Sequence, residues 1–136
     1  MGKYIMLTKD LINELAALGT DLNAKISFEN YLLKSGYTPL SERLFMKENP
    51  LELIRLSKEN GEKVYQNFEN KEDKGTLMDF IRNRSLDEGK VHPNQKVTTF
   101  IAAVDTAKAF HQKYPGQRPK PRELRALALK ARTPKI

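Results

Sequence analysis

The chain has 136 residues and a formal net charge of +7; 39% of its residues are hydrophobic, 30% are charged, and none is cysteine. This length and composition suit one globular domain with its own core, and the lack of cysteine excludes disulfides, thiolate metal ligands and cysteine nucleophiles. Neither a signal-peptide pattern nor a membrane-spanning apolar run occurs, so we expect a soluble, cytoplasmic protein that does not bind a membrane.

Helix signals dominate the beginning of the chain. Apolar residues recur at the spacing of one helical face and predict a helix over residues 9–18, with Gly19 as its stop. A second helix is expected to start at Asp21 or at Ser27 and to end near Lys34, where another glycine follows.

Two further helix starts are predicted where a capping residue stands directly before a proline. Thr38-Pro39 and Asn49-Pro50 both have this arrangement. It favours a helix N-terminus because proline's fixed φ suits the first turn and its missing N–H is not needed there. Glu52, three residues after Asn49, adds a capping box to the second of these short helices.

In the middle of the chain we expect one more short helix, then a loop, and then the start of another helix. After the break at Asn60-Gly61, a brief apolar stripe predicts a helix over residues 62–70. The very polar run over residues 70–75 has the composition of an exposed connecting loop. Thr76, with Asp79 three residues later, then predicts the start of the next helix.

The last third of the chain contains the strongest helix signal. An apolar stripe nearly five turns long predicts a helix over residues 94–114, which ends where proline and glycine follow Tyr114. Alternating prolines make residues 117–121 an extended linker. A final helix is expected to start at Pro121 or Arg122 and to run to about residue 132.

Together these elements predict an all-α fold, an irregular bundle of short helices around the long helix at about residues 94–114, with a basic C-terminal helix. Residues 1–90 contain 14 basic and 15 acidic side chains, whereas residues 91–136 contain 10 basic and 2 acidic ones. We therefore expect a near-neutral part over 1–90 and a basic part over 91–136, packed together as one domain with the last helix at its periphery.

This charge asymmetry favours nucleic acid or a nucleoprotein as the partner, because clustered positive charge attracts phosphates. The cations expected to contact the polyanion are Arg118, Lys120, Arg122, Arg125, Lys130 and Arg132. A secondary basic surface is expected at Arg82, Arg84, Lys108 and Lys113. The proline-rich break before the last helix is too long for a helix-turn-helix, so we expect phosphate contacts without base recognition.

An alternative is a protein–protein adaptor, inhibitor or assembly subunit. Its basic C-terminal helix would dock on an acidic protein surface, with Leu129 and residues 133–136 adding apolar contact. Enzyme activity is not expected, because His92 and His111 have no acidic or hydroxyl partner at a catalytic or metal-binding spacing. No catalytic residue, metal or cofactor is therefore predicted.

Overall fold

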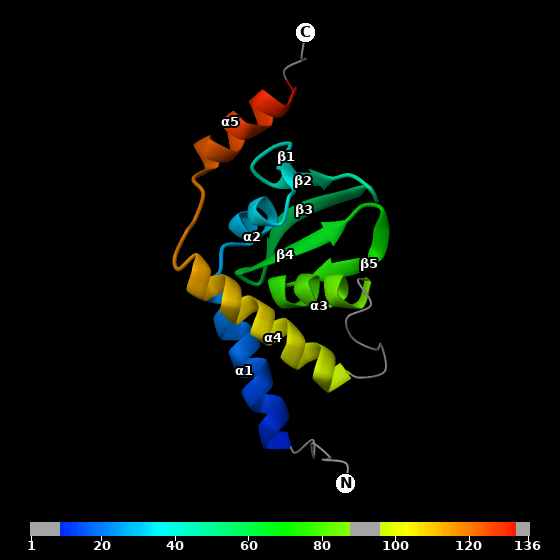
Figure 1. Ribbon diagram of the computed structural model, residues 1–136, viewed down its shortest axis with the longest axis vertical. Coiled ribbons are helices and arrows are strands. Elements are labelled where there is room, and N and C mark those ends of the chain that lie inside the picture. The colour runs from blue at the N-terminus through cyan, green and yellow to red at the C-terminus, as the bar shows by residue number, and fades with distance from the viewer. Residues whose placement is uncertain (1–8, 88–95, 133–136) are drawn as a thin grey trace.

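The fold combines helices with an antiparallel sheet (Figure 1). The computed structural model describes residues 9–87 and 96–132. In chain order its elements are α1 (Lys9–Lys25), α2 (Phe28–Lys34), β1 (Thr38–Pro39), β2 (Leu44–Lys47), β3 (Glu52–Glu59), β4 (Glu62–Asn67), β5 (Asn70–Gly75), α3 (Leu77–Asp87), α4 (Lys96–Lys113) and α5 (Pro121–Arg132). The strands follow one another in the order β1-β2-β3-β4-β5, each antiparallel to the next.

The prediction of an all-α fold is therefore wrong, and the errors lie between residues 38 and 75. Thr38-Pro39 forms the short strand β1, and Asn49-Pro50, joined by a cis peptide bond, lies in the turn between β2 and β3. The helix expected over residues 62–70 is largely strand β4. The loop expected over residues 70–75 is strand β5.

The hairpin between β3 and β4 explains why this region is extended. Asn60 and Gly61 have φ angles of 55° and 79°, which fit a two-residue turn whose twist matches that of the flanking strands. On one face of the two strands, Leu56 lies opposite Tyr65, and both are buried. Successive strand residues point to opposite faces, so this alternation overrides the helix-like spacing seen in the sequence.

Helix α1 also differs from its prediction, because it continues through Gly19 to Lys25. The glycine serves close packing rather than helix termination. A Cβ atom on Gly19 would lie 3.1 Å from the Phe100 ring of α4 and 3.7 Å from Met78 of α3. The small residue thus lets three helices approach one another.

Other predicted boundaries are confirmed. Ser27 caps α2 by accepting a hydrogen bond from the Asn30 N–H at 3.2 Å. Asp79 accepts a hydrogen bond of 2.9 Å from the Thr76 N–H at the start of α3. Helices α4 and α5 lie close to their expected bounds; the first two residues of the helix expected over 94–114 are outside the described residues. The division of the chain near residue 90 stays a prediction for the same reason.

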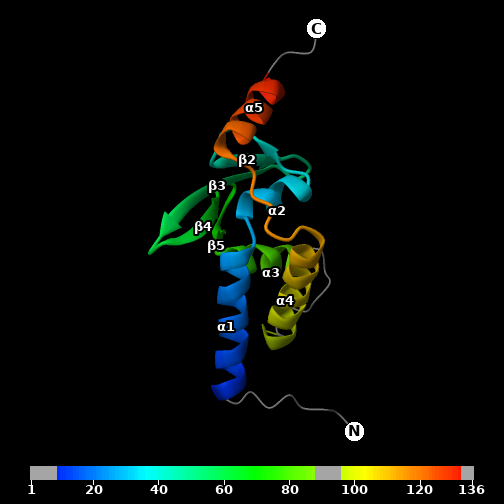
Figure 2. The ribbon, with the colours of Figure 1, turned by 90° about the vertical axis from the view of Figure 1, so that its left-hand side faces the viewer.

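The core lies between the sheet and the helices. Phe80 of α3 is at its centre, with edge-on aromatic contacts to Phe28, Tyr31, Tyr37 and Tyr65 at centroid separations of 5.0–6.1 Å. Helix α3 packs against β4 and β5 on one side and against α1 and α4 on the other (Figure 2). Because α3 contacts both layers, its position determines how the helices sit on the sheet.

Helix α5 is attached differently. It follows an extended linker and packs against β1, at the opposite end of the molecule from the first turns of α1 (Figure 1). Leu124 and Ala128 are buried in this contact, whereas Leu127 is 43% exposed. Among the residues described, no helix combines the length and the apolarity needed to cross a membrane.

Gly75 allows a stability prediction, because its φ angle is 134° and a Cβ there would lie 2.8 Å from the Asp79 Cβ. We expect Gly75→Ala to destabilise the protein by roughly 2 kcal/mol or more, through backbone strain and loss of the α3 cap. Gly36→Ala is the matched control, since its φ is 91° but nothing lies within 4 Å of the added carbon. Equal urea midpoints for the two variants would contradict the role of the cap.

Candidate functional site

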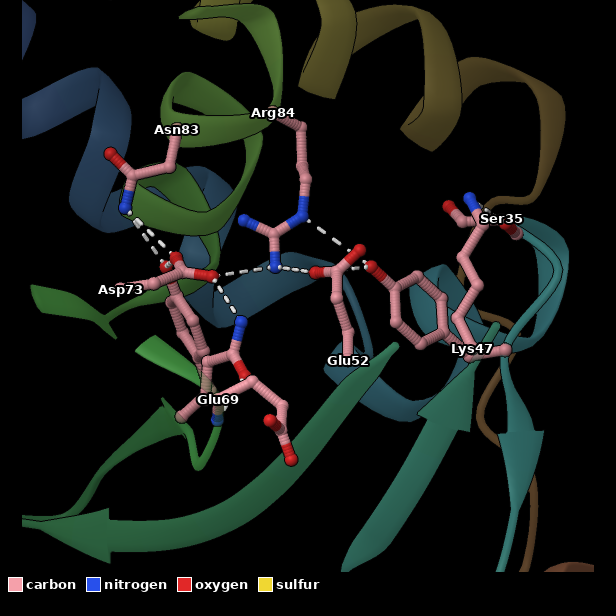
Figure 3. A network of polar contacts seen from close by, with 10 residues as sticks. Ser35, Lys47, Glu52, Glu69, Asp73, Asn83 and Arg84 are labelled. Atoms are coloured by element: carbon pink, nitrogen blue, oxygen red, sulfur yellow. Dashed lines mark hydrogen bonds and ion pairs between the residues drawn. The ribbon is translucent and has the colours of Figure 1, made fainter. Parts of the chain in front are cut away.

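Charged side chains from α3, β3 and β5 meet in a buried network (Figure 3). Arg84 Nη2 contacts Asp73 Oδ2 at 2.8 Å and also pairs with Glu52 Oε1. The three side chains are only 18%, 8% and 16% exposed for Arg84, Asp73 and Glu52, respectively. One guanidinium is therefore shared by two carboxylates from different strands.

Neutral side chains complete the network around the two carboxylates. The Tyr37 hydroxyl donates to Glu52 at 3.0 Å, and the Tyr65 hydroxyl donates to Asp73. Asn67 and Asn83 donate their amide N–H groups to Asp73 at 3.0 and 3.1 Å. Asp73 thus accepts hydrogen bonds from residues on β4 and α3, which fixes the edge strand β5 to both.

The network shifts the pKa values of its members. Burial alone would raise the pKa of the Asp73 carboxyl, but hydrogen bonds from Arg84, Tyr65 and Asn67 outweigh it and hold that pKa below its ordinary value. Burial raises the pKa of Tyr37 to about 12, and burial together with the Asp73 carboxylate raises that of Tyr65. Asp73 is therefore charged and both tyrosines are neutral near pH 7.

The arrangement fits a structural role better than a chemical one. The Arg84 guanidinium lies 4.1 Å from the Phe80 ring centroid. Its Nε and Nη2 groups make their polar contacts within the protein, and its buried Nη1 has no hydrogen-bond partner among the described residues. Arg84 was predicted to belong to a secondary basic surface, and the structure places it mostly inside, between two carboxylates. The network instead attaches α3 to β3 and β5.

The C-terminal cations lie along the linker and α5. Lys120, Arg122 and Lys130 are exposed and make no side-chain hydrogen bond or ion pair with a described residue. Arg118 is exposed and donates from Nη2 to the Ala24 carbonyl at 2.9 Å, and Arg125 pairs with Glu42. The backbone of Arg132 ends α5, and its side chain is outside the description.

The remaining predicted cations do not join this group. Arg82 lies 3.6 Å from Asp79 on its own helix. Lys108 is exposed on α4, and Lys113 lies 5.5 Å from the ring centroid of Tyr114. His111 is half-buried and its Nδ1 has no partner, whereas His92 is outside the described residues. No cluster able to hold a metal ion occurs in the described part of the chain.

Hollows border the linker where it passes the β3–β4 hairpin. One, of about 510 Å³, includes Arg118, and its neighbour, of about 540 Å³, includes Pro119 and Pro121. Both are also lined by Lys58 and Lys63 of the hairpin. Sequence analysis missed these two lysines because they lie in the near-neutral part of the chain. The strand register places them opposite each other, and the packing of the linker against the hairpin brings them near Arg118.

Comparison with protein-family models, with curated protein sequences and with solved structures found no match. Functional inference therefore depends on the charges and contacts described above.

The network predicts a large effect of removing its cation. Arg84→Met leaves two carboxylates buried without a counter-charge, so we expect it to lower the free energy of unfolding by roughly 3 kcal/mol. Arg82→Met, on the same helix but with one exposed partner, should change it by less than about 1 kcal/mol. Urea unfolding followed by circular dichroism measures both, and similar losses would mean that Arg84 does not hold α3 in place.

The tyrosine pKa values predict a loss of stability in alkali. An unfolded tyrosine ionises near pH 10, whereas Tyr37 in the folded protein ionises at about 12. Between these values the folded state keeps a proton that the unfolded state has lost, so stability falls as the pH rises. Urea unfolding from about pH 8 to about pH 11 should show this fall. Tyr37→Phe should make it shallower, and an unchanged slope would count against a neutral, buried Tyr37.

Proposed function

We propose that this protein binds nucleic acid or a nucleoprotein, mainly through phosphate contacts made by its C-terminal third. The observation that carries the proposal is the division of α5 into a docked side and a charged side. Leu124 and Ala128 are buried against the domain, while Arg122 and Lys130 remain exposed. The helix is thereby held in place while Arg122 and Lys130 make no ion pair with a described residue.

The balance of charge supports a polyanion as the ligand. After Gly116 the chain has seven basic residues and one acidic residue, Glu123. Such an excess raises the cost of folding slightly through repulsion, and a phosphate backbone relieves it. Four of the seven cations are arginines, whose planar donors match phosphate oxygens.

The expected contacts are with phosphates rather than with base edges. Lys120 and Arg122 flank Pro121, so the end of the linker and the first turn of α5 present neighbouring cations. Arg125 is already paired with Glu42, and this exposed pair costs little to exchange for a phosphate contact. Binding of this kind has little sequence preference and weakens steeply with salt.

A second candidate is docking of α5 on an acidic protein surface. It is favoured by Leu127 and Leu129, which are 43% and 69% exposed on the same helix as the cations. Exposed apolar side chains gathered in a patch mark protein interaction sites and contribute little to phosphate binding.

The proposal predicts a charge-specific loss of affinity. We expect the triple variant Lys120→Gln, Arg122→Gln, Lys130→Gln to bind labelled oligonucleotides at least about tenfold more weakly. The slope of log affinity against log salt concentration should also become shallower by about two to three. Its control, Lys9→Gln, Lys71→Gln, Lys74→Gln, has the same net charge but changes exposed lysines elsewhere. Fluorescence anisotropy at two or more salt concentrations measures both.

The outcomes separate the two candidates. Absence of oligonucleotide binding at low salt, or equal losses in the two triple variants, overturns the proposal. Leu127→Ser combined with Leu129→Ser should leave oligonucleotide affinity within about twofold of wild type. If the wild-type chain captures an acidic protein partner and the leucine variant does not, docking on an acidic protein replaces nucleic-acid binding as the proposed function.

A further inference from the structure

Cross-strand charges near the tip of the β3–β4 hairpin are arranged unfavourably for folding. Lys58 lies directly opposite Lys63, and Glu59 lies directly opposite Glu62. Like charges in these positions destabilise an antiparallel pair, whereas exchanging Lys58 with Glu59 would create two opposite-charge pairs from the same residues. The observed order therefore separates the charges by face, with lysines on one side of the hairpin and glutamates on the other.

The lysine face is the one turned toward the basic linker. Lys58 and Lys63 both line the two hollows that flank the linker, and Arg118 lines the first of them together with Thr20, Asn23 and Ala24. Lys63 pairs with Glu29 at 2.6 Å, while Lys58 makes no side-chain hydrogen bond or ion pair with a described residue. Lys58 thus lines the same hollow as Arg118 without an ion pair to a described carboxylate.

A third hollow on the linker, of about 420 Å³, has the same excess of donors. Its lining includes Lys34, Arg118 and Asn30, with Glu123 as the acidic member. Asn30 is only 5% exposed, and its Nδ2 has no acceptor among the described residues. A buried amide donor without an acceptor is costly unless a ligand supplies one.

We propose that the hairpin face formed by Lys58 and Lys63 and the facing linker residue Arg118 form one phosphate-binding cleft, which extends the basic surface of α5 onto the sheet. The ligand is a phosphodiester chain, since the three groups are all cationic donors. Three carboxylates also line these two hollows. In the second hollow, Glu29 is ion-paired with Lys63 and Glu42 with Arg125. Glu62 also lines the first hollow, although its strand position assigns it to the opposite face of the hairpin. This assignment rests on the proposed nucleic-acid binding and adds residues from the near-neutral half of the chain.

The test exchanges charges without changing composition. The double variant Lys58→Glu, Glu59→Lys keeps the net charge and turns both like-charge pairs into opposite-charge pairs. We expect its thermal unfolding midpoint to equal or exceed that of wild type. Its affinity for oligonucleotides should fall roughly tenfold, because one phosphate contact is lost and one repulsion is added. The matched control is Lys71→Glu, Glu72→Lys, which exchanges adjacent exposed charges on β5 and should bind within about twofold of wild type.

Single-stranded and double-stranded oligonucleotides are tested separately, because both contain the phosphodiester backbone that the cleft is proposed to bind. Weaker binding of either probe by the hairpin exchange, with the β5 exchange unaffected, supports the cleft. If wild type binds neither probe, the proposed function fails. If wild type binds with steep salt dependence and the two exchanges behave alike, only the cleft is refuted. If the hairpin exchange weakens binding of poly-glutamate but leaves oligonucleotide binding unchanged, the phosphate-binding cleft is refuted, and an acidic protein becomes the ligand of this surface.

Discussion

The position of α3 depends on the ion pairs that Arg84 makes with Glu52 and Asp73. Since α3 contacts the sheet on one side and α1 and α4 on the other, a shift of this helix would move two helices together. Phe80 alone would hold α3 through apolar contact, which has little directional preference. The buried charges restrict the orientation of α3, because any other placement would leave a buried charge without its counter-charge. Such groups can select one arrangement even when their net stabilisation is small.

The sequence predicts the helices much better than the sheet, for physical reasons. Helices α3, α4 and α5 carry long apolar stripes or local capping pairs, which are signals within one segment. Strand β5 is Asn70–Gly75, whose side chains are polar and exposed except near Asp73, and only its partners define it as a strand. The best missed signal is Asn60-Gly61, a preferred hairpin turn that we interpreted as a break between helices. Proline after a capping residue favours helix starts but also fits the edge position of β1.

Some residues of the candidate site could likewise be predicted from the sequence, and others could not. Cations that are close in sequence, such as Lys120 and Arg122, are recognised from charge density alone. Lys58 and Lys63 are identified only from the fold, in which the strand register places them opposite each other and the linker, more than fifty residues away in sequence, passes the same hollow. Arg84 illustrates the opposite error, because charge counting cannot distinguish an exposed arginine from one that neutralises buried carboxylates.

The short strand β1 has a further consequence for how the protein behaves at high concentration. A sheet edge with free backbone groups can recruit strands from other molecules and start aggregation. Here the β1 edge is two residues long and lies against α5, and the opposite edge strand carries Lys71, Glu72 and Lys74. The basic helix therefore also shields one end of the sheet. Leu124 and Ala128, which hold the helix against the domain, therefore also keep this edge of the sheet covered.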